Sequence, residues 1–172
     1  AATCRYADIA PIFERWHYKG RKIGGGITMF FALLIDGKIS GGAVLGKPRH
    51  NRKYAGHIDI RRLACNDKTH CNSESWFLGQ IIRWIAANTP YKHVLSYSDA
   101  TEQHTGGIYK ACNFRAVGQT APTKNVVWQG RKYHPRSLTV DRAYSRRLRA
   151  DLEQGLAYIE TGKPKTVWVY DI

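Results

Sequence analysis

Cysteine is scarce in this sequence of 172 residues, and its four cysteines form no C-x-x-C pair. Zinc ribbons and thiol redox motifs need closely spaced cysteines, so the sequence excludes both of these site types. Four cysteines in a chain of this length also argue against a secreted, disulfide-stapled fold. We therefore expect reduced and mostly buried thiols at Cys4, Cys65, Cys71 and Cys112.

Acidic residues are also few. Asp and Glu total 13 against 27 Lys and Arg, which gives a formal net charge of +14. A positive field of this size attracts polyanions, and nucleic acid is the commonest of them. Ribosome-associated proteins and other soluble basic proteins share this composition, so charge alone leaves those classes open.

Long apolar runs are absent as well. The longest apolar stretch falls far short of the length that spans a membrane. Ala1 to Arg15 lacks the basic segment followed by an apolar segment that is typical of a signal peptide. We therefore expect a cytoplasmic protein with no membrane partner.

Apolar residues nevertheless make up 43% of the sequence, and the length suits a single domain over residues 1–172. An apolar stripe from Phe77 to Ile85 gives the best helix signal, and Asp36-Gly37 between two apolar runs predicts a β-hairpin. The order of elements predicts an α/β fold with a mixed central sheet flanked by helices. The expected helices lie near residues 9–16, 74–87, 105–112 and 140–152, and the expected strands near 28–35, 38–45, 57–65, 93–97, 114–119, 126–128 and 166–170.

A first polar segment, residues 66–73, leads from a predicted strand into the helix at residue 74. A helix start offers unpaired N–H groups that suit a phosphate, and Asn72, Ser73 and Ser75 add amide and hydroxyl groups. An ordinary capped helix explains the same residues. The segment has neither G-x-G-x-x-G nor G-K-[ST], so nucleotide binding through those motifs is not indicated.

A second polar segment, residues 96–109, follows a predicted buried strand, where ligands bind in open α/β sheets. Asp99 or His104 is a candidate general base, and Tyr109 is a candidate general acid or hydrogen-bond donor. The alternative is that Asp99 only caps a turn and Tyr109 packs in the core.

A third segment, residues 129–137, interleaves cations with an aromatic ring, a pattern that suits a phosphate backbone with a base stacked nearby. We expect it to bind nucleic acid, with help from Lys47 to Lys53. The later Arg142, Arg146 and Arg149 are interpreted as a solvated helix face. The nucleic-acid candidates are Arg131, Lys132, Tyr133, His134 and Arg136.

Five runs in fixed order resemble the Mom family of bacteriophage proteins. They are Arg61 to Ala64, Asn72 to Leu78, Ser96 to Asp99, His104 to Phe114 and Tyr133 to Ser137. The similarity is close from Ile58 to Leu138 and looser elsewhere. It implies a fold like that of the GCN5-related N-acetyltransferases, which hold the pyrophosphate of an acyl-CoA at the loop and helix start found here at residues 66–75.

The resemblance also implies roles for individual residues. Arg62, Asn72, Ser73 and Ser75 fall on the cofactor side, and acyl-CoA (acetyl-CoA) is the cofactor expected there. The catalytic positions implied are Asp99, Tyr109, His17, Tyr18 and Ser75. Iron is implied too, with His17, Tyr18, Asp99 and Tyr109 as candidate ligands. The segment from Asn66 to Asn72 departs from the family of acetyltransferases in lacking their Gly-rich loop, which argues against ordinary CoA binding.

The function implied is a DNA-modifying transferase that converts adenine N6 in phage DNA to a carbamoylmethyl-type adduct. The adduct protects the DNA from host restriction, so the protein would act in the cytoplasm of an infected bacterial cell. The target base must leave the double helix, and Tyr133 or Trp16 is expected to stack on it. Two alternatives stay open: an acetyl-CoA-dependent N-acetyltransferase acting on a protein or small amine, and a DNA-binding module without chemistry.

Overall fold

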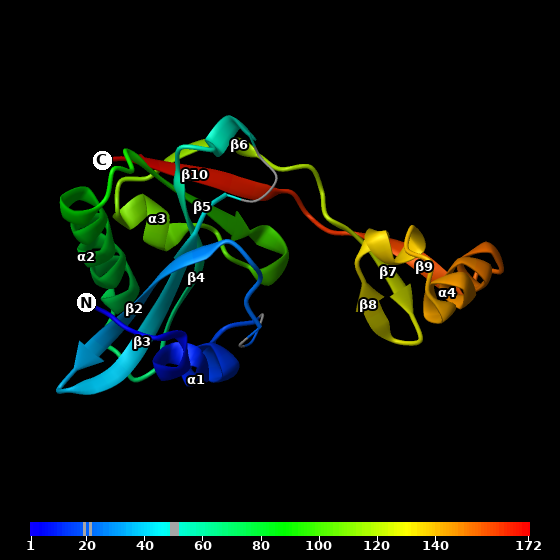
Figure 1. The fold of residues 1–172 in the computed structure, drawn as a ribbon, viewed down its shortest axis with the longest axis horizontal. Helices are drawn as coiled ribbons and strands as arrows, with labels where there is room; N and C mark the ends of the chain where they lie inside the picture. The colour runs from blue at the N-terminus through cyan, green and yellow to red at the C-terminus, as the bar shows by residue number, and fades with distance from the viewer. Residues whose placement is uncertain (19, 21, 49–51) are drawn as a thin grey trace.

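The computed structural model describes residues 1–18, 20, 22–48 and 52–172, and it divides the chain into a large body and a small lobe (Figure 1). The body contains a seven-stranded sheet and the lobe a three-stranded sheet. Neighbouring strands of the main sheet are antiparallel, except for the parallel pair β4 and β5. From edge to edge the main sheet consists of β1 (Ala2–Thr3), β2 (Ile27–Ile35), β3 (Lys38–Gly46), β4 (Ile58–Cys65), β5 (His93–Asp99), β10 (Lys165–Asp171) and β6 (Arg115–Gln119).

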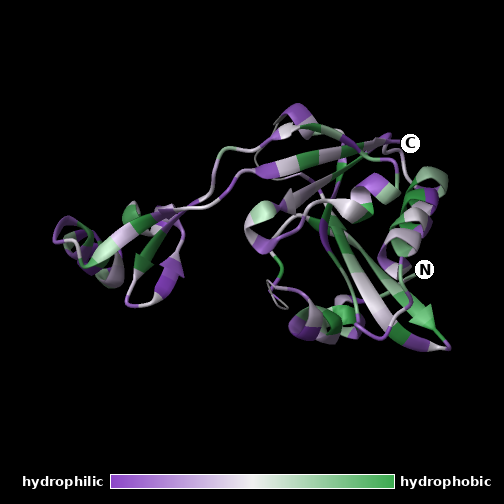
Figure 2. Cartoon of the chain, turned by 180° about the vertical axis from the view of Figure 1, so that it is seen from behind, coloured by the Kyte–Doolittle hydropathy of each residue, from purple (hydrophilic) through white to green (hydrophobic). Residues whose placement is uncertain are grey.

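Helices cover both faces of the main sheet. α1 (Tyr6–Trp16) packs Phe13 against Ala32 and Val44 on one face. α2 (Ser73–Asn88) and α3 (Gly107–Ala111) lie on the other face, where Phe77 packs with Phe31. Adjacent residues of one strand serve opposite layers because side chains alternate across a sheet. The strands between the layers are largely hydrophobic (Figure 2). The predicted α/β fold with a mixed, helix-flanked sheet is therefore confirmed.

The parallel strands β4 and β5 stay together only where they begin. Their pairing consists of Ile58 with Val94 and Asp59 with Leu95, and no later pair joins them within the described residues. β4 also bulges against β3, because Arg62 pairs with Val44 and Ile60 with Leu45, which leaves Arg61 as an extra residue. A bulge bends its strand. The two strands therefore part toward their carboxyl ends, where ligands bind in open α/β sheets.

The lobe is an insertion between β6 and β10. It contains β7 (Lys124–Trp128), β8 (Arg131–Tyr133), the 3₁₀ helix η3 (Pro135–Leu138), α4 (Ala143–Glu153) and β9 (Ala157–Thr161). Its sheet has the order β8-β7-β9, and α4 packs Leu148 against Val126 and Trp128. The Trp128 indole also donates a 2.5 Å hydrogen bond to Asp151 of α4. Only two short segments, residues 120–123 and 162–164, join the lobe to the body (Figure 1).

The lobe departs from the expected single sheet. Residues 131–133 and 157–161 form strands that carry too few apolar residues in alternation to be predicted. Residues 131–136, to which the sequence assigned no helix or strand, form β8 and the start of η3. The assignment of residues 1–172 to a single acyltransferase-like domain stays a prediction, and the structure adds that the lobe has its own small core.

The structure also bears on the expected end of the first helix, on the cysteines and on membrane-spanning segments. α1 ends at Trp16 with His17 as its C-cap, so His17 and Tyr18 do fall at the helix end. The four cysteines are free, but the expectation of mostly buried thiols is wrong: only Cys65 is buried, and Cys71 is exposed in the loop before α2. No helix in the described part of the chain is long and apolar enough to cross a membrane.

Candidate active site

A cavity of about 800 Å³ lies where β4 and β5 part. Its walls come from segments far apart in the sequence: the end of α1, strand β4, the end of β5, the loop into α3, and the first residue of β10. The predicted site residues His17, Tyr18, Arg62 and Tyr109 all line this cavity. Its volume falls within the range of about 300–1,000 Å³ that is typical of small-molecule sites.

Three rings form an aromatic rim on this cavity: His17, Tyr18 and His104. The Tyr18 ring stacks on His17 with centroids 4.8 Å apart and meets His104 edge-on at 5.3 Å. Tyr18 is 45% exposed, so part of its ring is open to a planar ligand. Burial of the hydroxyl, together with the nearby charge of Asp99, raises the pKa of Tyr18 to about 12. Tyr18 therefore presents a protonated hydroxyl at neutral pH.

Tyr109 is placed on α3 with its ring in the core. The ring packs against Phe114 and Trp168, and its phenol oxygen accepts a 2.8 Å hydrogen bond from the Ser96 hydroxyl on β5. Burial raises the pKa of Tyr109 above its ordinary value. Tyr109 therefore packs in the core, which was one interpretation of the sequence, and it also lines the cavity with its hydroxyl protonated, as the hydrogen-bond donor of the other interpretation requires.

Asp99 ends β5, and its carboxylate is held on both oxygens. Lys165 Nζ lies 2.7 Å from Oδ2, and the Thr101 backbone N–H donates to Oδ1 at 3.1 Å. Burial alone would raise the pKa of Asp99, but the lysine and the hydrogen bonds outweigh it and hold that pKa below its ordinary value. Asp99 is thus ionised at neutral pH. Among the described residues, Lys165 belongs to the cavity lining whereas Asp99 does not.

Arg62 brings a cation to the β4 side of the cavity. Its guanidinium donates to the carbonyl of Arg61 at 2.8 Å and to the carbonyl of Lys22 at 3.3 Å. The same positive charge opposes the rise in the pKa of Tyr18. The neighbouring Arg61 lines the same cavity, where its guanidinium pairs with Asp59 at 2.9 Å.

A second cavity, of about 530 Å³, lies at the start of α2. Asn72, Ser73 and Ser75 line it, and Glu74 and Gly107 line both cavities, so the two spaces are neighbours. Asn72 is the N-cap residue in a left-handed conformation (φ +69°), with no side-chain cap bond. The first N–H groups of a 16-residue helix, together with two hydroxyls, suit the phosphates of a cofactor. These residues fit the phosphate end of an acyl-CoA, with Asp67 and Glu74 as opposing charges in the same lining.

The four residues implied as iron ligands do not fit an iron site in this structure. The Asp99 carboxylate is engaged by Lys165 and Thr101, and the Tyr109 oxygen by Ser96. Within residues 1–18, 20, 22–48 and 52–172, no group of three or more His, Cys, Asp or Glu side chains is arranged to hold a metal ion. We therefore assign no step of the chemistry to iron.

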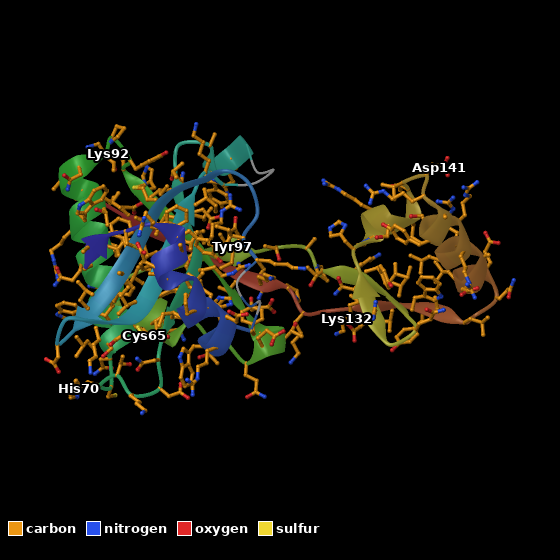
Figure 3. All side chains as sticks on the ribbon, turned by 60° about the horizontal axis from the view of Figure 1, so that its bottom comes forward. Cys65, His70, Lys92, Tyr97, Lys132 and Asp141 are labelled. Atoms are coloured by element: carbon orange, nitrogen blue, oxygen red, sulfur yellow. The ribbon has the colours of Figure 1, made fainter. Side chains whose placement is uncertain are left out.

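The five nucleic-acid candidates all lie on the lobe, away from the cavity. Arg131 and Arg136 are exposed, and His134 caps η3 by accepting from the Arg136 N–H at 3.1 Å. Lys132 pairs across the sheet with Glu160 at 2.6 Å. Glu160 raises the pKa of Lys132, and Glu102 of the 3₁₀ helix η2 (Ala100–Glu102) adds to it, so Lys132 lies on the side of the lobe toward the body (Figure 3).

One of the expected DNA contacts packs within the lobe. Tyr133, expected to stack on the flipped base, lies tilted against Trp128, stacks on Tyr144 and is partly buried. Residues 49–51 of the basic loop Lys47 to Lys53 lie outside the described residues, so its expected role stays a prediction. Trp16, the other ring expected to stack on a base, does line the main cavity.

Sequence reasoning missed Lys165 altogether. It stands in a Pro- and Lys-containing stretch with no motif, and nothing local distinguishes it from the other lysines. Its partnership with Asp99 arises because β10 runs antiparallel to β5 and places the two residues directly opposite each other. A cross-strand pair between segments 66 positions apart leaves no signal in a single sequence.

Comparisons with known proteins agree on the architecture. The model of the Mom protein family matches residues 2–164. A Bacillus subtilis acetyltransferase in complex with CoA is similar in structure, with a TM-score of 0.52 at 10% identity, over 84% of this chain and 76% of that chain. An N-acetyltransferase from Staphylococcus aureus gives 0.50 at 15% identity, over 83% and 67%. The sequence matches no curated protein. Likeness at such low identity shows the fold, and the fold is that of the GCN5-related acetyltransferases.

Proposed function

Because the chain belongs to the Mom protein family, we propose that it is a transferase that places a carbamoylmethyl-type group on N6 of adenine in double-stranded DNA. One observation carries this proposal. Four of the positions implied by that family come from three separate parts of the fold and line a single cavity: His17, Tyr18, Arg62 and Tyr109. Its product would shield phage DNA from restriction in the cytoplasm of an infected bacterial cell.

Adenine N6 is inside the double helix, so the base must be flipped out to reach the cavity, at a cost of a few kcal/mol. The exposed part of the Tyr18 ring, in the aromatic rim, offers a stacking surface for a purine. Trp16 lines the same cavity and offers a second one. The cavity of about 800 Å³ has room for a base together with the reacting end of a donor.

The transfer requires that N6, a weak nucleophile, attack an electrophilic carbon. The N6 lone pair forms the new N–C bond, the donor's leaving group departs with its bonding electrons, and N6 loses one proton. The donor belongs to the class of activated acetamide-type compounds, since the product carries a methylene carbon on N6. We assign the N6 proton to the ionised Asp99, reached by way of the cavity edge at Lys165, and the hydrogen bond to the leaving group or its carbonyl to Tyr109.

The second cavity is assigned to the donor or its carrier. Asn72, Ser73 and Ser75 at the start of α2 would hold phosphates, with Arg62 as the cation on the main cavity. An acyl-CoA, when bound, would supply an activated acyl group at its thioester, which suits N-acetylation. Transfer of the carbamoylmethyl group needs instead an acetamide-type donor with a leaving group on its methylene carbon. Glu74, Gly107 and Ile108 line both cavities, so the donor's reacting end would reach the main cavity past these residues.

DNA is assigned to the lobe. Arg131 and Arg136 are exposed there and can meet phosphates directly, whereas Lys132 is already paired with Glu160. Phosphate contacts position a duplex and carry little sequence information. The cavity, by contrast, reads the flipped base itself.

The proposal is tested by nucleoside mass spectrometry on plasmid DNA from bacteria that express the chain. We expect deoxyadenosine to appear with a carbamoylmethyl group in place of one N6 hydrogen. The matched control is Asp99→Asn, which keeps the shape of the side chain and removes its charge. Unmodified deoxyadenosine with folded wild-type protein in the same cells contradicts the proposal.

The cavity at the start of α2 also favours a second candidate, an acetyl-CoA-dependent N-acetyltransferase acting on a protein or small amine. This candidate predicts acetyl transfer from acetyl-CoA to peptides or amines, with DNA nucleosides unchanged. Incubating purified protein with labelled acetyl-CoA and each acceptor in turn separates the two.

A further inference from the structure

The ion pair of Lys165 with Asp99 joins the cavity to the base of the lobe. Lys165 is the first residue of β10, immediately after the segment that returns from the lobe. Its ammonium group lies 2.7 Å from Asp99 Oδ2, and the two side chains are only 19% and 12% exposed. An ion pair shielded from water in this way interacts more strongly than one on the surface.

The lobe root, defined here as residues 120–123 and 162–165, is tied to the same carboxylate by backbone bonds. Thr101, whose N–H donates to Asp99 Oδ1, accepts with its hydroxyl a 3.2 Å bond from the Lys163 N–H. Lys165 and Thr120 exchange bonds as well, Lys165 N–H to the Thr120 hydroxyl at 3.0 Å and Thr120 N–H to the Lys165 carbonyl at 2.9 Å. Both oxygens of Asp99 are therefore fixed by groups that belong to, or are bonded to, the lobe root.

We propose that Lys165 is a positioning residue that holds Asp99 ionised and oriented beside the cavity from the root of the lobe. Without this cation, burial would raise the pKa of Asp99 and weaken its preference for the ionised form. Loss of the lysine would also free one carboxylate oxygen to turn away from the cavity edge. The catalytic part of this inference rests on the proposed adenine chemistry. The part that concerns the charge and orientation of Asp99 does not depend on that chemistry.

The position of Lys165 at the lobe root connects the lobe to Asp99. Any movement of the lobe about its two connecting segments acts first on Lys165 and on the Lys163–Thr101 bond, and through both on Asp99. The lobe root thus connects two parts of the molecule: the lobe, which would hold the DNA duplex, and Asp99, which would accept the proton. A surface ion pair elsewhere on the body would have no such connection.

The test measures the titration of the Asp99 carboxyl carbon by NMR in the purified full chain, with Asp99→Asn used to assign the signal. In the wild type we expect a pKa below the ordinary value for aspartate, about 3.9. In Lys165→Met it should rise by about 1 to 3 pH units, because a close opposite charge is lost. In Lys165→Arg it should stay low. Lys92→Met is the control, since Lys92 is exposed at the far end of the body (Figure 3).

Activity is read in parallel as the modified fraction of deoxyadenosine in plasmid DNA. We expect Lys165→Met to lose about tenfold or more, because its Asp99 carboxylate is no longer held in one orientation by the ion pair. Complete removal of a general base costs about 10²-fold or more. Lys165→Arg should restore most of the activity, and Lys92→Met should match the wild type. A purely structural role predicts instead that activity follows thermal stability across the variants, with no change in the Asp99 titration.

The outcomes separate the two proposals. An unchanged Asp99 pKa in folded Lys165→Met overturns the positioning role, whatever the substrate. If Lys165→Met does not fold, the titration of Asp99 in the wild type provides the test. A wild-type pKa at or above the ordinary value for aspartate means that Lys165 does not hold Asp99. A low, lysine-dependent pKa in a protein that leaves DNA unmodified upholds the positioning of Asp99 and overturns adenine as substrate.

Discussion

The hydroxyl of Ser96 donates a hydrogen bond of 2.8 Å to the phenol oxygen of Tyr109, and both residues are buried. Since the phenol oxygen accepts from Ser96, its own proton is left for another acceptor. Tyr109 also lines the cavity, and burial raises its pKa, so the proton stays on the oxygen at neutral pH. This arrangement presents a hydrogen-bond donor of fixed direction at the edge of the cavity.

Tyr109→Phe removes this donor and keeps the ring contacts with Phe114 and Trp168. If Tyr109 donates to the reacting group, the modified fraction of adenine should fall by about 10²-fold. Stability should fall by only about 0.5–1.5 kcal/mol, the net worth of one hydrogen bond. Nucleoside mass spectrometry and urea unfolding measure the two effects.

Ser96→Ala is the matched control, because it removes the same hydrogen bond from the other side. We expect a similar loss of stability, about 0.5–1.5 kcal/mol, and a much smaller loss of modification. Equal losses of modification in the two variants would falsify the donor role and assign the pair to packing alone.

Gly106, which precedes α3 and lines the cavity, should tolerate no side chain. Its φ is +81°, and a Cβ placed there would overlap the indole ring of Trp168. Gly106→Ala should therefore cost about 2–5 kcal/mol, from left-handed strain and overpacking together. Gly107→Ala is the control, since a Cβ there meets nothing within 4 Å, and its effect should stay within about 1 kcal/mol. Urea unfolding of both variants provides the measurement.

The glycine pair also illustrates how far the sequence carries. A Gly-Gly pair in a sequence is compatible with a backbone that a ligand approaches closely. The structure explains Gly106 instead by its conformation and by Trp168, a residue 62 positions away. Patterns of neighbouring residues predicted correctly those features that depend on neighbouring residues alone. The Asp36-Gly37 turn has φ of +49° and +73°, as a tight hairpin requires, and the apolar stripe of α2 is buried as a unit.

Long-range features could not be predicted, because their causes lie in pairing between distant strands. The cavity depends on how β4 and β5 part after two residue pairs, and Lys165 meets Asp99 only through the register of β10. The packing of Tyr133 could not be predicted either, because its partners Trp128 and Tyr144 follow no single period in the sequence. The resemblance to a family supplied His17 and Tyr18, which no local pattern distinguished.

His57 should make the protein less stable as the pH falls. Its ring lies between Tyr54 and His93, at centroid distances of 5.1 and 4.7 Å, and its buried Nδ1 has no hydrogen-bond partner among the described residues. Burial, with the neighbouring His93, lowers the pKa of His57. A depressed pKa contributes stability above the unfolded value of about 6.5, and that contribution is lost as the pH falls from there toward the folded pKa.

Urea unfolding at pH 7 and pH 5 tests this expectation. His57→Phe keeps an aromatic ring against Tyr54 and His93, so its stability should change less between the two pH values than that of the wild type. The carboxylate of Asp171, whose pKa is lowered by Arg115, titrates below this window and does not interfere. His70→Phe, at an exposed position, should keep the wild-type dependence; a flattened curve there instead would contradict the assignment to His57.

The lobe should bind DNA through unpaired cations rather than through its total charge. Arg131 and Arg136 are exposed, whereas Lys132 already has Glu160 at 2.6 Å. Each arginine that contacts a phosphate releases counterions, so Arg131→Ala or Arg136→Ala should lower the salt slope of binding by about 0.9. Affinity for a short duplex, measured by fluorescence anisotropy at several salt concentrations, gives the slope.

The double variant Lys132→Ala with Glu160→Ala makes this test specific, because it removes one cation and one anion and leaves the net charge at +14. If Glu160 neutralises Lys132, the double variant should bind DNA with the wild-type salt slope. Lys132→Ala alone should weaken binding, because it leaves the Glu160 carboxylate facing the duplex. A slope that falls by about one in the double variant would mean that Lys132 leaves Glu160 to meet a phosphate when DNA binds. The side of the lobe that faces the body would then be part of the DNA-binding surface.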